Sequence, residues 1–117
     1  MIDGVGPGWI GVDLDGTLAE YHGRDNGKIG GPIPAMVERV KAWRAAGREV
    51  RIVTARVALG AGRTYSQIAQ EHNQITDWCR EYIGQELPVT ASKDFMMLEL
   101  WDDRVVHVEK NTGRILG

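Results

Sequence analysis

The sequence has almost no cysteine and no long apolar run. Cys79 is the single cysteine among 117 residues, which excludes an intramolecular disulfide and a thiolate-rich metal cluster. The apolar runs are a few residues long, far shorter than a membrane span, and residues 1–8 lack the basic and apolar regions of a secretory signal. We therefore expect a cytoplasmic protein with no membrane partner.

The chain also lacks a strong excess of either charge. Its 14 basic and 16 acidic residues give a formal net charge of −2, so bulk charge gives no strong signal for nucleic-acid binding. With 43% hydrophobic and 26% charged residues, the composition is that of an ordinary globular protein. The length leaves room for one domain, and we expect residues 1–117 to fold around a single core.

Two glycine-rich segments lack the spacing of a nucleotide phosphate loop. Residues 4–9 read GVGPGW and residues 23–28 read GRDNGK. Neither contains G-x-x-x-x-G-K-[ST], in which backbone N–H groups cradle phosphates and the lysine reaches them. We therefore exclude a nucleoside triphosphatase of that type.

Short apolar segments alternate with amphipathic helices. Helices are predicted from Pro34 to Gly47 and from Thr64 to Ile83, the second opened by a Thr64/Gln67 capping box. Strands are predicted at residues 9–13, 49–54, 87–91, 97–101 and 104–109, the last continuing into a ribbon through the turn at 111–113. This order predicts an α/β fold with a mostly parallel sheet. One conflict is that about five residues separate the third and fourth strands, whereas a parallel crossover needs about a dozen.

Polar residues stand at the carboxyl ends of the first four predicted strands. In open α/β sheets this edge is where ligands bind. We therefore expect residues that are far apart in the sequence to meet at one site: Asp13, Asp15, Thr54, Lys93, Asp102 and Asp103.

The types of residue at this edge indicate phosphoryl chemistry. Carboxylates that lie so close together repel one another unless a cation sits among them, and hard oxygen ligands suit Mg²⁺. A lysine and a threonine hydroxyl beside the metal would form a pocket for an oxyanion. Phosphate is the commonest such substrate, so the sequence predicts a magnesium-dependent phosphoryl-transfer site.

Three segments carry a resemblance to a known family. GVDLDGT at 11–17, IVTAR at 52–56 and SKDFMMLELWDD at 92–103 resemble, in this order, the four motifs of the haloacid-dehalogenase superfamily of phosphohydrolases. The resemblance covers roughly residues 9–105. It implies a three-layer, Rossmann-like fold and hydrolysis of a phosphomonoester through an aspartyl-phosphate intermediate.

The resemblance also implies roles for four catalytic residues. Asp13 would be the nucleophile that attacks phosphorus, and Asp15 would be the general acid and then the general base. Thr54 would bind a phosphate oxygen through its hydroxyl. Lys93 would neutralise the charge that Asp13 and the phosphoryl group share.

Metal and substrate ligands follow from the same comparison. Mg²⁺ would be bound by Asp13, Asp15 (through its backbone carbonyl), Asp102 and Asp103, with the division of roles within the last pair left open. Gly16 and Thr17 would border the substrate or would only shape the turn and cap it. Arg56 would contact a substrate phosphate or anchor its loop; both readings remain open.

Family members usually carry a cap domain after the first or second motif, and here only short segments follow both. An open site suits a phosphorylated small metabolite, a nucleotide or an accessible macromolecular phosphate, or closure by a second subunit in a homo-oligomer. Two other classes stay open. One is a receiver-type signalling domain, which expects its phospho-accepting aspartate after the third strand, where this chain has none. The other is a phosphate-binding protein without turnover.

Overall fold

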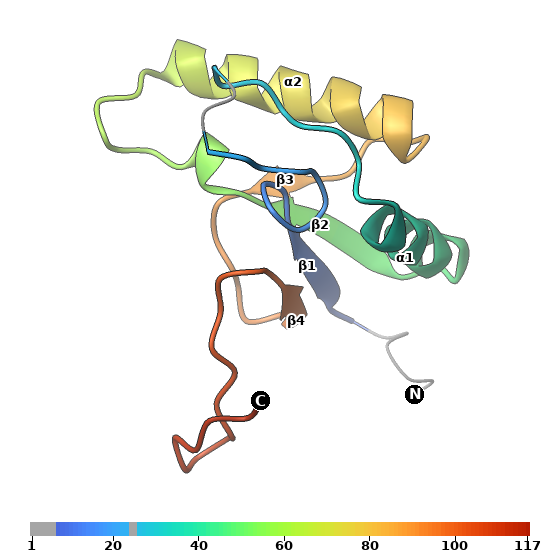
Figure 1. Cartoon of the computed structure of the whole chain (residues 1–117), viewed down its shortest axis with the longest axis vertical. Helices are drawn as coiled ribbons and strands as arrows, with labels where there is room; N and C mark the ends of the chain where they lie inside the picture. Colours follow the sequence, from blue (N-terminus) through green and yellow to red (C-terminus); the bar gives the residue numbers. More distant parts are fainter. Residues whose placement is uncertain (1–6, 24–25) are drawn as a thin grey trace.

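Within residues 7–23 and 26–117, which the computed structural model describes, short strands alternate with two long helices (Figure 1). Most of the segment expected to lack a secretory signal, at residues 1–8, therefore lies outside the described residues. The elements in chain order are β1 (Trp9–Asp13), α1 (Pro34–Ala45), β2 (Glu49–Val53), the 3₁₀ turn η1 (Ala55–Val57), α2 (Tyr65–Tyr82), β3 (Val89–Thr90) and β4 (Met97–Trp101).

The four strands form one parallel sheet in the order β3-β2-β1-β4. Asp13 at the end of β1 is in register with Val53 at the end of β2, and Val12 is in register with Trp101 at the end of β4. Parallel strands have their carboxyl ends at the same edge of the sheet, so the polar residues that follow β1, β2 and β4 lie close together at that edge. The predicted parallel α/β fold is confirmed.

Both helices form for reasons visible in the sequence. Pro34 starts α1, where a missing N–H costs nothing, and Met36, Val37 and Val40 form its buried side. The capping box at the start of α2 is present: the Thr64 hydroxyl accepts from the backbone N–H of Gln67, whose side chain accepts from the Thr64 N–H.

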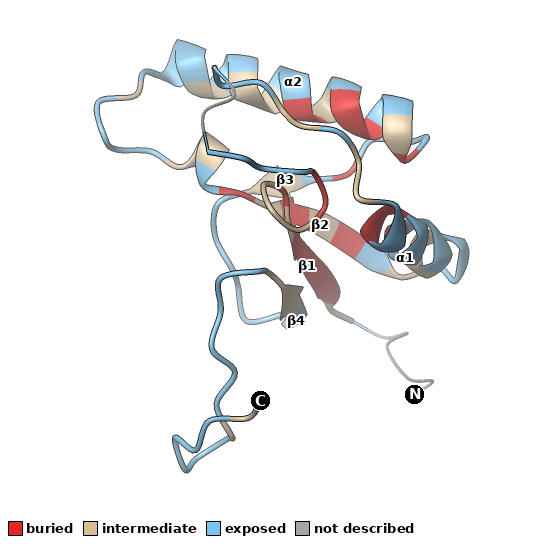
Figure 2. Cartoon of the chain, in the orientation of Figure 1, coloured by how far each residue is buried: buried red, intermediate tan, exposed pale blue. Residues whose placement is uncertain are grey.

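The core lies between the sheet and the two helices (Figure 2). Side chains alternate along a strand, and the alternate positions of β1 and β2 that point to this core are Ile10, Val12, Val50 and Ile52. They pack with residues of both α1 and α2 in a single cluster. Both helices therefore cover the same face of the sheet.

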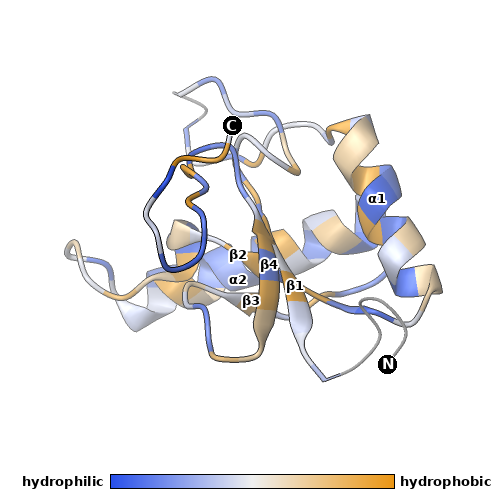
Figure 3. Ribbon diagram, turned by 90° about the horizontal axis from the view of Figure 1, so that it is seen from below, coloured by the Kyte–Doolittle hydropathy of each residue, from blue (hydrophilic) through white to orange (hydrophobic). Residues whose placement is uncertain are grey.

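The expected third layer is absent from the described part of the chain. Instead, residues 91–96 link β3 to β4 without a helix, and Figure 3 shows the strands in front of α2, with α1 beside them. The link is fastened by Trp9, whose Nε1 donates to Asp94 Oδ1 at 2.9 Å while the Arg51 guanidinium lies 4.4 Å from the Trp9 ring centroid. Two layers, rather than three, build this fold.

The strand order also resolves the conflict over the short connection. β3 and β4 lie at opposite edges of the sheet, so the link crosses the sheet diagonally instead of making a crossover between neighbours. Three strand spacings amount to about 14 Å across the sheet and four residues to about 13 Å along it, which makes a diagonal of about 19 Å; six extended residues reach about 20 Å. The segment is long enough for the crossing and too short to hold a helix.

Two strand predictions need correction. The third strand is Val89–Thr90 rather than residues 87–91. Residues 104–109 form no strand; the ribbon that follows β4 contains one isolated antiparallel bridge, from Val108 to Ile115. The turn at 111–113 does bring residues 107–109 beside 114–116, as the predicted ribbon requires, but the paired stretch is too short to count as a strand. In that described part, neither helix is long and apolar enough to cross a membrane.

Candidate active site

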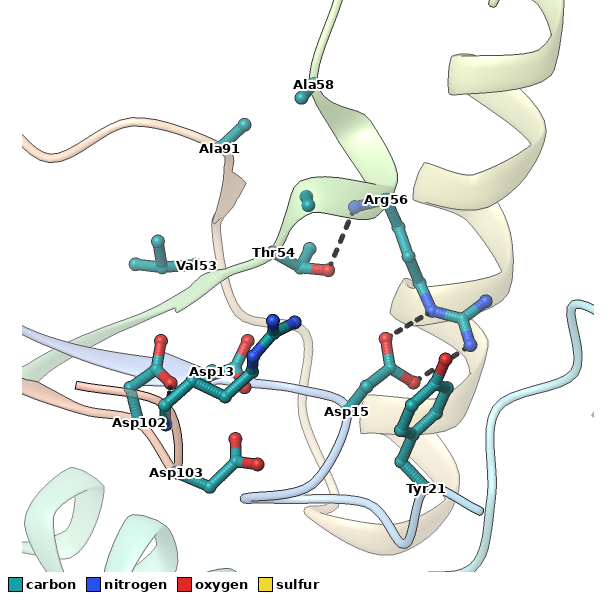
Figure 4. Close-up of a pocket in the computed structure, with 12 residues that line it drawn as sticks. Asp13, Asp15, Tyr21, Val53, Thr54, Arg56, Ala58, Ala91, Asp102 and Asp103 are labelled. Carbon is teal, nitrogen blue, oxygen red and sulfur yellow. Dashed lines mark hydrogen bonds and ion pairs between the residues drawn. The ribbon is translucent and has the colours of Figure 1, made fainter. Parts of the chain in front are cut away.

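A cavity of about 660 Å³ opens at the carboxyl edge of the sheet (Figure 4). The segments that follow β1, β2 and β4 supply most of its walls. Its lining residues are Asp13, Asp15, Tyr21, Val53, Thr54, Ala55, Arg56, Ala58, Ala91, Asp102, Asp103 and Arg104. Five of the six residues expected at this edge therefore lie in one cavity, the exception being Lys93.

Three carboxylates form a tight cluster in this cavity, which we call the acidic cluster: Asp13, Asp102 and Asp103. One oxygen from each lies within 4.8 Å of the others. Asp13 ends β1, and the other two follow β4 directly, so parallel pairing of these two strands brings them together. The donors are all carboxylate oxygens, which is the set that suits a hard divalent cation.

The electrostatics of the cluster are those of crowded like charges. Burial, then the charge of Asp102, then a hydrogen bond and the charge of Asp103 raise the pKa of Asp13 to about 7. Desolvation and neighbouring negative charge both disfavour the ionised form. A cation placed among these oxygens would reverse this effect and restore Asp13 to a carboxylate.

The turn after β1 holds Asp103 in place. The Thr17 hydroxyl donates to Asp103 Oδ1 at 3.1 Å and accepts from the Asp103 N–H at 3.0 Å. Gly16 has a φ of +89°, and a Cβ at this position would lie 2.6 Å from Asp103 Oδ2. Glycine is thus needed here both for the backbone conformation and for the close approach. In this arrangement, Thr17 and Gly16 contact a carboxylate of the cluster.

Asp15 points away from the acidic cluster and toward Arg56 (Figure 4). The guanidinium donates to both Asp15 oxygens, at 2.7 and 2.9 Å, and also to Glu71 on α2 at 3.2 Å. These pairings hold the pKa of Arg56 above its usual range. An ion pair therefore orients the Asp15 side chain. The same contacts anchor the loop that carries Arg56, which is one of the two roles expected for this residue.

Thr54 is buried at the end of β2, with 3% of its surface exposed. Its hydroxyl oxygen accepts from the Arg56 N–H at 3.1 Å and so caps η1. Because that bond uses an oxygen lone pair, the hydroxyl proton stays available to donate into the cavity.

Lys93 lies outside the cavity. It is an exposed residue on the link between β3 and β4 and is absent from the cavity lining. Arg104, directly after the acidic pair, lines the cavity. The sequence analysis did not predict Arg104, although its position directly after Asp103 indicates a cation close to the site. It did not predict Glu71 either, and no sequence pattern points to that residue. Tyr21 lines the mouth of the cavity and is about half exposed.

No protein-family model matches the chain, and no curated protein sequence matches it. Among solved structures, that of a conserved protein coded by a locus of Bacteroides thetaiotaomicron is similar, with a TM-score of 0.59 and 22% sequence identity. The similarity covers 86% of this chain and 79% of that one. At this identity the likeness concerns the fold alone.

Proposed function

We propose that the chain is a Mg²⁺-dependent phosphomonoester hydrolase, a small capless member of the haloacid-dehalogenase superfamily. The observation that carries the proposal is the meeting of Asp13, Asp102 and Asp103, with one oxygen of each within 4.8 Å, in a cavity that Thr54 also lines. Residues separated by some ninety positions in the sequence thus supply a nucleophile, metal ligands and a phosphate-binding hydroxyl to one place.

The proposed reaction has two steps. In the first, an Asp13 oxygen attacks phosphorus, the ester P–O bond breaks, and Asp15 gives its proton to the leaving alkoxide. In the second, Asp15 takes a proton from a water molecule that attacks the aspartyl-phosphate; the bond between phosphorus and Asp13 breaks, releasing phosphate. Throughout both steps, the Thr54 hydroxyl donates to a phosphate oxygen. Arg56 keeps hold of one Asp15 oxygen, while the other oxygen turns from the guanidinium to give and take the proton.

The acidic cluster fits Mg²⁺ through its donor chemistry. Asp13, Asp102 and Asp103 would hold the ion, and Gly16 and Thr17 fix Asp103 for that purpose. When bound, Mg²⁺ supplies charge neutralisation for the nucleophile and the phosphoryl group. The positive charge expected from Lys93 would come instead from Arg104, which lines the cavity.

The strand order favours this proposal over a receiver domain. The flavodoxin-like order of receivers, 2-1-3-4-5, places the first strand beside the third, whereas here β1 lies between β2 and β4. The residues after β3, Ala91 and Ser92, also offer no carboxylate to accept a phosphoryl group.

The direct test is Mg²⁺-dependent release of phosphate from p-nitrophenyl phosphate by the wild-type protein and by the Asp13→Asn and Asp15→Asn variants. We expect turnover by the wild type, none without a divalent cation, and a loss of at least about 10³-fold in both variants. Equal rates for the wild type and Asp13→Asn would contradict the assignment of the nucleophile. Labelling by acetyl phosphate without turnover would indicate a receiver, and phosphate binding without either reaction would indicate a binding protein.

A further inference from the structure

The last fourteen residues, 104–117, form an arm that extends from the body of the protein after β4 (Figure 1). Its apolar side chains are at least half exposed at Val105, Val106, Val108 and Ile115. Its two sides are held together by one backbone bridge, by backbone hydrogen bonds from Glu109 to Arg114 and from Leu116 to His107, and by a 2.7 Å ion pair between Glu109 and Arg114. A lone two-stranded ribbon is marginally stable in water at best. The arm therefore has apolar surface and β-forming sequence that residues 7–23 and 26–103 leave largely uncovered.

The dimensions of the chain agree with an arm outside the body. The radius of gyration is 14.9 Å, against about 13 Å for a compact chain of this length. Figure 3 shows hydrophobic and hydrophilic residues along the whole arm.

The neighbouring edge of the sheet is open. β4 pairs with β1 on one side, and within the described residues no strand pairs with its other side. Beside this edge, Phe95 is fully exposed and Leu98 is half exposed. An open edge presents unpaired N–H and C=O groups to which a further strand can add.

The arm and the edge have opposite charges. Asp102, Asp103 and Arg104 line the cavity and are left out of this comparison. Residues 94–101 then contain two acidic residues and no basic one, a net charge of −2. Residues 105–117 contain Lys110 and Arg114 against Glu109, so two positive charges minus one negative charge leave +1. Apolar residues lie among the charges of both segments. The arm is therefore complementary to the edge of β4 in hydrogen bonding, hydropathy and charge.

In this structure the arm does not pair with β4 of its own chain. Two hydrogen bonds between Thr17 and Asp103 fix the point at which the arm begins, and from there the arm leads away from the sheet (Figure 1). We propose that the arm of one copy adds to the outer edge of β4 in a second copy, and that the second copy's arm does the same in return. Such a reciprocal exchange gives a closed two-fold dimer and is independent of the enzymatic proposal.

The first experiment measures the mass of the full chain by light scattering after size exclusion. We expect twice the 13.0 kDa of one chain for the wild type and one chain mass for Val106→Asp, on the arm, and for Leu98→Glu, on the edge. Leu59→Asp is the matched control, because Leu59, on a loop after η1, is about as exposed as Val106, and it should remain dimeric. A monomeric wild type would overturn the proposal. So would a dimer dissociation constant equal to that of the wild type in both the arm variant and the edge variant.

The second experiment distinguishes arm exchange from direct pairing of two edges. In an equimolar mixture, the Leu98→Glu copy keeps its arm and the Val106→Asp copy keeps its edge, so one of the two contacts can still form. We expect a mixed dimer at concentrations at which each variant alone is monomeric. A mixture that stays monomeric where the wild type is fully dimeric would refute the exchange. Circular dichroism of each variant checks that the fold is intact.

Discussion

Arg56 and Asp15, 41 positions apart in the sequence, face each other as a guanidinium fork and a carboxylate. Nε donates to Oδ2 at 2.7 Å and Nη2 donates to Oδ1 at 2.9 Å. The pair ties the turn after β1 to the turn after β2, and Glu71 adds a contact from α2. The orientation of the proposed general acid thus depends on a residue outside the acidic cluster.

Replacing Arg56 with lysine keeps the charge and removes the fork. A lysine ammonium cannot bind both carboxylate oxygens in parallel, so Asp15 should lose its fixed direction. We expect kcat for phosphate release to fall by about 10- to 100-fold with a small change in KM. The matched control is Arg51→Lys, since Arg51 pairs with Glu49 and Asp94 and is absent from the cavity lining. Equal effects of the two variants would contradict a specific role for Arg56.

Gly16→Ala tests the close contact with Asp103. The added Cβ would lie 2.6 Å from Asp103 Oδ2, so the carboxylate must move. Gly84→Ala is the control, because Gly84 has a similar φ of +92° and nothing within 4 Å of the added atom. Both variants should lose about 1 kcal/mol of stability through backbone strain. We expect Gly16→Ala alone to weaken Mg²⁺ binding, by about tenfold or more, as measured by calorimetry; equal affinities in both variants would show that Asp103 is not a ligand.

Parts of this site follow from local rules, and parts depend on the length of the connections. The meeting of Asp13 and Asp102 is predictable because both come at the carboxyl ends of parallel strands. Lys93 was expected there for the same reason, but it lies on a six-residue link that crosses the sheet, and that path cannot be read from strand propensity. Residues 104–109 have the pattern of a strand, yet only 107–109 lie beside a partner segment, and the isolated sequence does not reveal how far such a pairing extends. The Arg56–Asp15 pair required the relative placement of two turns.

The two candidate cations near the site give opposite expectations. Arg104 lines the cavity and Lys93 does not. If positive charge in the cavity assists phosphate binding, Arg104→Gln should raise KM for p-nitrophenyl phosphate by about tenfold, while Lys93→Gln should leave kcat and KM near those of the wild type. Steady-state kinetics of the two variants provides the measurement. A large loss with Lys93→Gln alone would restore the role that the family resemblance implies for Lys93.

The raised pKa of Asp13 makes a prediction about stability and pH. The pKa rises from 3.8 in its ordinary state to about 7 in the fold, chiefly through burial and then through Asp102 and Asp103. The folded protein therefore holds a proton that the unfolded chain releases, so the free energy of unfolding falls as pH rises from about 4 to 7 and stays low above that range. The penalty at high pH is at most about 4 kcal/mol. Asp13→Asn removes it.

We therefore expect Asp13→Asn to raise the melting temperature in the presence of a chelator near pH 8 and to change it little near pH 4. Mg²⁺ should stabilise the wild type more than this variant near pH 8, because a cation compensates the charge that the variant lacks. Asp77→Asn is the control: Asp77 is an exposed carboxylate on α2 that pairs with Arg80 at 3.1 Å. Calorimetry at both pH values provides the measurement. An equal gain at both would contradict the raised pKa of Asp13, since the charge penalty must disappear once Asp13 is protonated.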